Sequence, residues 1–312
     1  MDCLVTGGAG FIGSNLVDAL LARGDRVVVV DNLSTGKRQN LAGALAAGVE
    51  LREVDIRDAH ALTEVFAEVG PELVFHLAAQ IDVRHSVDDP AADAGSNVLG
   101  AINVLVAAHQ HGAGRVVNTS TGGGLYGDAE LMPTPEDHPI RPLAPYGQSK
   151  HAAEGYFELY DRLYGLSTVS LRYGNVYGPR QDVHGEAGVV AIFCGCLLEG
   201  RMPQIFGDGT QTRDWADVAD VVNANLLAAH SSVTGPINIA GGEETSVLDL
   251  VDALRDVGAE RGLTLEQPEF REGRPGEVGR SCLDVSRARR ELGWEPAVTL
   301  RDGLRRILQG LL

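Results

Sequence analysis

Lysine is almost absent from this sequence of 312 residues, because only Lys37 and Lys150 occur among its 26 basic residues. The 43 acidic residues outnumber the basic ones and give a formal net charge of −17. A surface of that sign repels nucleic acid and anionic lipid, so we expect neither as a partner. An anionic ligand would need a locally basic site, and an isolated lysine in an arginine-rich chain is a candidate functional residue.

Long apolar runs are also lacking. No stretch of about 18 consecutive apolar residues occurs, so we expect no membrane span. The N-terminus has no charged lead-in followed by an apolar stretch; Cys3, Leu4 and Val5 enter a strand directly. We therefore expect no signal peptide and a cytoplasmic location.

Cysteine is scarce and carries no metal pattern. The four cysteines form no Cys-x-x-Cys pair, and no nearby pair of histidines completes a zinc set. We expect buried, reduced thiols and no metal site. The cysteines are Cys3, Cys194, Cys196 and Cys282.

Short runs rich in Val, Ile and Leu alternate with longer segments of helical periodicity in the first half of the chain. The helix-like segments include an apolar face through Val98, Ile102, Leu105 and Val106. This alternation predicts an α/β fold, a doubly wound parallel Rossmann-type sheet with helices on both faces. The expected strands lie near residues 2–6, 26–30, 49–55, 72–77, 114–119 and 167–172.

The rhythm changes after about residue 173, where turn-rich stretches appear. We expect residues 1–173 to form the nucleotide-binding sheet domain and residues 214–240 to fold back onto it. Residues 174–312 would form a smaller C-terminal substrate-binding lobe, with the ligand in the cleft between the two.

A glycine-rich turn, Thr-Gly-Gly-Ala-Gly-Phe-Ile-Gly, follows the first predicted strand. Gly7, Gly10 and Gly13 are spaced three apart, and Phe11 and Ile12 lie at the start of the predicted helix. Glycines here let the backbone turn tightly and approach a pyrophosphate at the N-terminus of a helix.

Acidic residues end the next two predicted strands. Asp31 lies 18 residues after Gly13, where a carboxylate can bind ribose hydroxyls and repel a 2′-phosphate, which favours NAD over NADP. Lys37 and Arg38 follow closely and would soften that preference. Asp55 and Ile56 end the third strand, in position for an adenine edge.

Tyr146 and Lys150 lie four residues apart in a predicted helix, so both face the same side one turn apart. A phenol with a pKa near 10 is a poor base at neutral pH. A nearby ammonium, together with an oxidised nicotinamide, would stabilise the phenolate and make Tyr146 a general base.

These motifs resemble the extended, nucleotide-sugar-modifying branch of the short-chain dehydrogenase/reductase family. Further matches are His76-Leu77-Ala78-Ala79, Asn97 at the start of the next helix, and Asn118-Thr119-Ser120-Thr121. The resemblance implies NAD as cofactor and a homodimer paired through the helix near 97–111 and the Tyr/Lys helix. The additional NAD contacts that it implies are Asn32, Leu77, Ala78, Ala79, Asn97, Tyr146, Lys150 and Tyr173.

The resemblance also implies a catalytic hydroxyl after the fifth strand, with Thr121 as first choice and Ser120 one register away. Related 4,6-dehydratases carry Thr-Asp-Glu here, whereas this chain has Thr121-Gly122-Gly123 and no carboxylate for elimination. UDP-glucose 4-epimerases are the best match, which implies oxidation and re-reduction at one carbon through a 4-keto sugar. UDP-glucuronate and UDP-N-acetylglucosamine stay open as substrates; a 4,6-dehydratase, a net dehydrogenase and a non-catalytic NAD-binding regulator are less favoured.

The UDP-sugar site is likewise implied by position. Arg213 and Arg274 would bind the diphosphate, because a guanidinium holds phosphate oxygens bidentately. Glu277 would accept from the uridine ribose. The resemblance adds Tyr146 and Thr121 at the sugar 4-hydroxyl, and the remaining substrate contacts are Asn175, Val189, Phe206 and Ser281.

Overall fold

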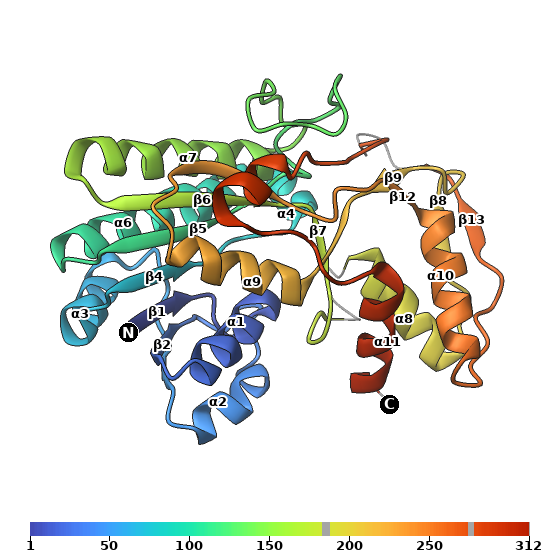
Figure 1. Cartoon of the computed structure of the whole chain (residues 1–312), viewed down its shortest axis with the longest axis horizontal. Coiled ribbons are helices and arrows are strands. Elements are labelled where there is room, and N and C mark those ends of the chain that lie inside the picture. Colours follow the sequence, from blue (N-terminus) through green and yellow to red (C-terminus); the bar gives the residue numbers. More distant parts are fainter. Residues whose placement is uncertain (183–187, 274–277, 312) are drawn as a thin grey trace.

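The computed structural model describes residues 1–182, 188–273 and 278–311. Its main element is a seven-stranded sheet in the order β11-β6-β5-β4-β1-β2-β3, in which every neighbouring pair is parallel (Figure 1). The doubly wound Rossmann-type sheet is therefore confirmed. The strands are β1 (Asp2–Thr6), β2 (Arg26–Val30), β3 (Glu50–Arg52), β4 (Leu73–His76), β5 (Arg115–Thr121), β6 (Ser167–Tyr173) and β11 (Gly235–Ile239).

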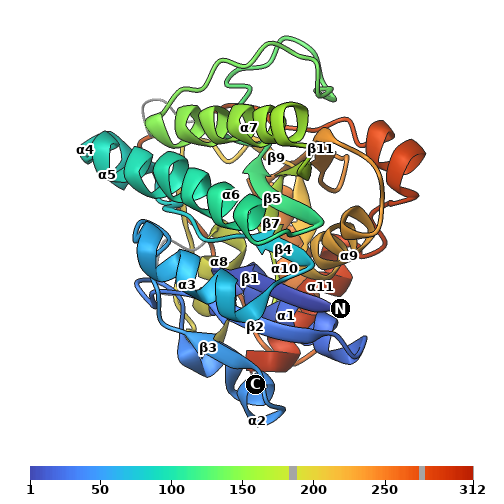
Figure 2. The ribbon, with the colours of Figure 1, turned by 90° about the vertical axis from the view of Figure 1, so that its left-hand side faces the viewer.

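Helices cover both faces of the sheet (Figure 2). Successive strand residues point to opposite faces, so Cys3 and Val5 join one apolar core and Leu4 joins the other. The helices on the Val5 side are α1 (Phe11–Ala22), η1 (Arg38–Leu41), α2 (Ala42–Ala46) and α9 (Val218–Ala229). Those on the Leu4 side are α3 (Ala59–Val69), α6 (Gly100–Gln110) and α7 (Pro145–Tyr164).

One helical stretch within the described residues, Pro90–Gln110, is long and apolar enough to cross a membrane by length and composition, with a mean hydropathy of 1.3. It joins α5 (Pro90–Ala94), the π-helical turn η2 (Gly95–Leu99) and α6. Ala101, Val104 and Leu105 are fully buried in the core, which accounts for the composition. The buried face differs from the predicted one, since Val98 and Ile102 are only half-buried.

The C-terminal lobe has its own core, in which Phe193, Leu250 and Leu304 are buried. Three helices surround it, and short paired strands link it to the sheet. The helices are α8 (Val189–Glu199), α10 (Val247–Ala259) and α11 (Leu300–Leu311). The pairs are β7 (Asn175–Tyr177) with β10 (Trp215–Asp217), β8 (Gln204–Phe206) with β13 (Glu269–Arg271), and β9 (Thr212–Arg213) with β12 (Thr245–Ser246). The other helices are α4 (Val83–Asp88) and η3 (Ala288–Leu292).

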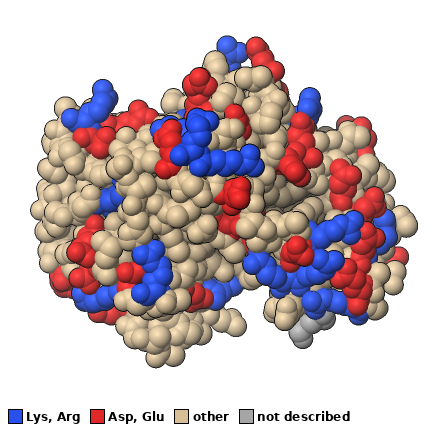
Figure 3. Space-filling model, viewed as in Figure 1, with Lys and Arg blue, Asp and Glu red and all other residues tan. Residues whose placement is uncertain are grey.

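Several arginines of the lobe surface are paired with carboxylates. Acidic and basic side chains lie side by side over the lobe in Figure 3. On α11, Arg301 pairs with Asp256 and Arg305 with Glu260, both at 2.7 Å. All four cysteines are buried and free, as predicted.

Candidate active site

The glycine-rich turn is closed too tightly for side chains. Gly7 has φ +69°, and a Cβ there would lie 2.6 Å from the backbone nitrogen of Ala78. A Cβ at Gly13 would lie 2.2 Å from the carbonyl oxygen of Gly7. Helix α1 begins at Phe11 without a side-chain cap and without acidic residues in its first turn. Its free N–H groups and positive dipole end therefore suit a phosphate group.

Asp31 holds the glycine turn against the end of β2. Its carboxylate accepts hydrogen bonds from the backbone N–H of Ala9 at 2.9 Å and of Leu33 at 2.8 Å. Burial raises the pKa of Asp31 above its ordinary value, against those two hydrogen bonds. The two backbone donors leave further lone pairs on the carboxylate for ribose hydroxyls.

The predicted adenine-side residues lie together. Asn32 Nδ2 donates to Asp55 Oδ2 at 2.9 Å, and the Arg57 guanidinium, at 2.7 Å from the same oxygen, holds the pKa of Asp55 well below its usual range. The Ile56 side chain packs against Gly100, the first residue of α6. A β-carbon added to Gly100 would lie only 2.5 Å from Ile56 Cδ1.

The two cations that follow Asp31 are committed to carboxylates. Lys37 Nζ lies 2.7 Å from Asp182, and Arg38 lies 3.0 Å from Glu53. A 2′-phosphate would therefore compete with a carboxylate for either cation.

Thr121 and Tyr146 meet where β5 ends and α7 begins. Both side chains flank Gly124, where a Cβ would lie 3.2 Å from Thr121 Cγ2 and 3.5 Å from Tyr146 Cε1, and the backbone N–H of Gly124 donates to Thr121 Oγ1 at 3.2 Å. Burial raises the pKa of the Tyr146 phenol to about 12, and the nearby Thr121 hydroxyl opposes that rise. The phenol therefore needs a nearby positive charge before it can act as a base.

Lys150 is the candidate for that charge and lies one helical turn later on α7. It is 5% exposed, and burial lowers the pKa of its ammonium to about 8, against the carboxylates of Glu154 and Asp93. Burial and the charge of Lys150 lower the pKa of His76 to about 3, so this imidazole is neutral. Its Nδ1 lies 2.8 Å from Thr6 Oγ1.

Ser120 points away from the side of Thr121, because adjacent strand residues face opposite sides of the sheet. It is buried on the α7 face, beside Glu154 rather than Tyr146. Glu154 in turn pairs with Arg172 at 2.7 Å, and both side chains are 3% exposed. Of the two hydroxyls that the sequence left open, Thr121 is the one that lies by Tyr146.

Two residues predicted to contact NAD use their side chains inside the protein. Asn97 does not open a helix but lies inside Pro90–Gln110, where its amide binds the backbone N–H and carbonyl of Gln80, both at 2.9 Å. The Tyr173 hydroxyl accepts from Asn225 at 2.7 Å and lies 3.3 Å from Thr119 Oγ1, on the α9 face. These hydroxyl and amide groups therefore position neighbouring elements.

The predicted substrate residues lie on the lobe side of Thr121. Asn175 begins β7, and a Cβ at Gly123 would lie 3.7 Å from its Oδ1. Ser281 lies two residues before Leu283, whose side chain packs on the loop after Thr121. A β-carbon added to Gly122 in that loop would lie only 2.3 Å from Leu283 Cδ1. Val189, Phe206 and Arg213 lie at the start of α8, the end of β8 and in β9.

Arg274 and Glu277 lie outside the described residues. The segments on either side of them contact the strands that carry Phe206 and Arg213. The backbone N–H of Gly207 donates to Arg271 at 2.9 Å, and that of Thr212 donates to Gly279 at 3.1 Å.

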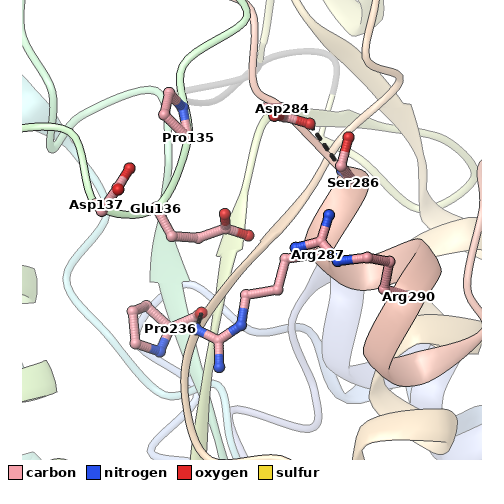
Figure 4. A pocket seen from close by; sticks show the side chains of 8 residues that line it. All are labelled: Pro135, Glu136, Asp137, Pro236, Asp284, Ser286, Arg287 and Arg290. Atoms are coloured by element: carbon pink, nitrogen blue, oxygen red, sulfur yellow. Dashed lines mark hydrogen bonds between the residues drawn. The ribbon is translucent and has the colours of Figure 1, made fainter.

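A cavity of about 460 Å³ lies apart from this set, at the β11 edge of the sheet (Figure 4). Arg287 on its wall donates to the carbonyl oxygens of Pro236 at 2.6 Å and Thr234 at 3.0 Å. None of the lining residues was predicted from the sequence, and we assign it no part of the site. They are Pro135, Glu136, Asp137, Pro236, Asp284, Ser286, Arg287 and Arg290.

Residues 4–307 match the GDP-mannose 4,6 dehydratase family. The chain belongs to this family. It is thus an extended short-chain dehydrogenase/reductase, and the resemblance drawn from its motifs is confirmed.

Proteins similar to this chain include UDP-glucose 4-epimerases. The chain is 48% identical to a UDP-glucose 4-epimerase of Mycolicibacterium smegmatis, over 99% of this chain and 98% of that protein. It is 43% identical to a Thermotoga maritima UDP-glucose 4-epimerase solved with UDP-glucose, with a TM-score of 0.95 and coverage of 100% and 98% of the two chains. It is 42% identical to a Thermus thermophilus UDP-glucose 4-epimerase solved with NAD, with a TM-score of 0.90 and coverage of 99% and 98%.

In this family member, side chains outside the recognised motifs also position the catalytic helix. The Ser86 hydroxyl, on α4, accepts from the backbone N–H of Tyr146 at 3.1 Å, where α7 has no side-chain cap of its own. Asp93, on α5, is fully buried and raises the pKa values of both Tyr146 and Lys150. No motif in the sequence indicates either residue, since both act through packing between distant segments.

Proposed function

We propose that this protein is an NAD-dependent 4-epimerase of a UDP-hexose, interconverting UDP-glucose and UDP-galactose. The decisive observation is the contact of Thr121 with Tyr146, one turn from the buried Lys150, beside a loop whose residues 122–124 are all glycine. Groups for one proton transfer are present, while the carboxylate that elimination needs is missing from that loop.

The cofactor proposal rests on the geometry of the first strands. The uncapped N-terminus of α1 offers N–H groups to the pyrophosphate, and Asp31 offers carboxylate oxygens to a ribose. A 2′-phosphate would meet the charge of Asp31, and the nearby cations Lys37 and Arg38 are neutralised by Asp182 and Glu53. This arrangement favours NAD over NADP.

The proton chemistry belongs to the protein. Tyr146 takes the proton of the sugar 4-hydroxyl as carbon 4 is oxidised, and it returns a proton to the 4-keto sugar when that carbon is reduced from the other face. Lys150 stabilises the phenolate, and Thr121 holds the reacting hydroxyl beside Tyr146. When bound, NAD supplies the hydride acceptor and donor, so the reaction consumes no external reductant.

Substrate binding energy should be concentrated on the UDP moiety, because the keto sugar must turn between the two hydride transfers. Arg213 is proposed to bind the diphosphate, Phe206 to lie against the uracil and Asn175 to contact a phosphate or sugar oxygen. These residues lie in the lobe, whereas the reacting groups lie on the sheet domain.

Of the two alternative substrates, the structure favours UDP-N-acetylglucosamine over UDP-glucuronate. UDP-glucuronate would use the hydroxyl run 119–121 for its carboxylate, but the Thr119 hydroxyl lies against Tyr173 and Ser120 is buried beside Glu154. Ser281 is a small residue in a half-buried position, which leaves UDP-N-acetylglucosamine as the second candidate.

We also propose a homodimer and a cytoplasmic location. The resemblance implies pairing through the helix near 97–111 and α7, and exposed apolar side chains lie on η2 and α7 and on the neighbouring α4. They include Leu99, Tyr156 and Leu163, with Val83 and Val87 on α4. The four buried free cysteines suit a reducing compartment. Light scattering of the purified protein tests the dimer.

Incubation with three UDP-sugars, without added NAD, followed by product separation, tests the activity. The substrates are UDP-glucose, UDP-N-acetylglucosamine and UDP-glucuronate. We expect UDP-galactose from the first and slower turnover of the second. Accumulation of a stable keto sugar, or reduction of free NAD during turnover, would contradict the proposal.

A further inference from the structure

Asp93 is a carboxylate in an unusual setting. It is fully buried in α5, and no residue of the described ranges forms an ion pair with it. Its Oδ1 accepts from Gln80 Nε2 at 2.9 Å and from Asn97 Nδ2 at 3.1 Å, while its Oδ2 has no hydrogen-bond partner there. Burying a carboxylate without a counter-charge is expensive, so its retention needs a reason.

The carboxylate lies against the catalytic helix. Asn97 Nδ2, which binds Asp93, also lies 3.1 Å from Ser149 Oγ, and Ser149 lies next to Lys150 on α7. The negative charge of Asp93 acts on both catalytic groups, favouring the protonated forms of Tyr146 and Lys150.

We propose that Asp93 is a positioning residue that acts by its charge, as the distant counter-ion of Lys150. Its charge sets the pH at which Tyr146 and Lys150 each gain or lose a proton. The proposal rests on the proposed function only in using Tyr146 as the acid and base. Epimerisation requires Tyr146 both to lose and to return a proton. A carboxylate that favours the protonated phenol assists the return, and one that keeps Lys150 charged assists the loss.

Other groups face the same pair and are not altered in the test. Thr121 contacts Tyr146 from β5, the neutral His76 faces Lys150 from β4, and Glu154 lies one turn beyond it on α7. Glu154 differs from Asp93 because its charge is matched by Arg172.

The substitution Asp93→Asn tests the charge alone. The amide oxygen still accepts from Gln80 and Asn97, and the new NH₂ replaces the oxygen that has no partner. Asp88→Asn is the matched control, since it removes the same charge from an exposed position at the end of α4. Asp93→Ser provides a second charge-free variant should the amide fold poorly.

The first measurement needs no turnover. Phenolate absorbance of the NAD-loaded protein is titrated, and the trace of the same variant carrying Tyr146→Phe is subtracted. We expect the Tyr146 titration to move to lower pH by about one unit in Asp93→Asn and to stay in place in Asp88→Asn. An unchanged titration in Asp93→Asn and Asp93→Ser would overturn the proposal even if the protein epimerises UDP-glucose.

The second measurement is the pH profile of kcat/KM. Loss of a negative charge eases deprotonation of both Tyr146 and Lys150, so both limbs should move to lower pH together. A merely structural role would lower the whole profile without moving its limbs, and that result would also overturn the proposal. Should no UDP-sugar be turned over, the titration still decides the role of Asp93 while the proposed function fails separately.

Discussion

The catalytic end of the sheet and the C-terminal lobe hold their functional residues in different ways. Tyr146 and Lys150 lie on α7, a helix of 20 residues that packs on β5 and β6. Arg213 and Phe206 lie on strands of two and three residues, each paired with one other short strand. A buried polar network fixes the first set, whereas backbone pairing between loops fixes the second.

This difference teaches how the two tasks are divided. Proton transfer needs atoms held within tenths of an ångström, which interior packing provides. Holding UDP while the sugar turns needs strong contacts to one end of the ligand and tolerance at the other. Substitutions at the catalytic end should therefore change kcat or stability, and substitutions in the lobe should change KM.

Tyr146→Phe should have the largest effect. Without the phenol there is no acid or base at carbon 4, so kcat should fall by about 10³- to 10⁴-fold. UDP binding, measured by calorimetry, should stay within a few-fold of the parent value. Comparable loss of UDP binding would show that the catalytic end and the lobe are not separate in function.

Arg172→Met should destabilise the fold by about 3–5 kcal/mol, because it leaves the Glu154 carboxylate buried without its partner. The measurement is urea unfolding, and the double variant Arg172→Met/Glu154→Gln should recover part of the loss. Arg305→Met is the surface control, for which we expect little change in stability since its ion pairs are exposed. Equal costs for the two arginines would remove the contrast between buried and exposed ion pairs.

Lys150→Met should abolish turnover yet stabilise the protein near pH 7. Burial lowers the pKa of Lys150 from 10.5 to about 8, so keeping the native ammonium charged costs about 3 kcal/mol at lower pH. The cost diminishes as pH rises from about 8 towards 10.5, where the unfolded lysine also loses its proton. Thermal unfolding should show the variant to be more stable than the parent near pH 7, by a difference that narrows over that range. A variant less stable than the parent near pH 7 would contradict the predicted cost of the buried ammonium.

Arg213→Gln should act on KM, raising it about 10- to 100-fold while kcat changes by only a few-fold, as expected for lost charge-assisted hydrogen bonds to phosphate. Arg271→Gln is the control, because this lobe arginine is exposed and pairs with Glu269 at 2.8 Å. Steady-state kinetics with UDP-glucose distinguish the two. A fall in kcat at unchanged KM would place Arg213 with the catalytic groups.

The sheet and the catalytic pair could be predicted because their signals are local. Alternating apolar runs and helical periodicity indicate the strands and helices, and the glycine turn, Asp31, Tyr146 and Lys150 lie within recognisable motifs. The sequence alone could not show which hydroxyl faces Tyr146, because a one-residue shift in the register of β5 exchanges Thr121 with Ser120 on the other face.

The supporting residues could not be predicted because they act across distant parts of the chain. Asp93 meets α7 more than 50 residues away, and Ser86 is separated from Tyr146 by 60 residues. Asn97 lies in a recognisable motif, but the sequence gives no sign that its side-chain amide bonds the backbone of Gln80. Side chains with such partners become visible only when the helices are packed.

The edge strand β11 imposes an order on synthesis. It pairs with β6 from Gly235 to Ile239, yet α8 and the short strands β7 to β10 lie between the two strands in the chain. A ribosome that has released residues 1–173 has made every other strand of the sheet and left the edge of β6 unpaired. Such an edge is a template for association between nascent chains until α9 and β11 emerge to cover it. The first part of the lobe, with α8, must therefore be translated before the edge of β6 is covered, whereas α10 and α11 follow later.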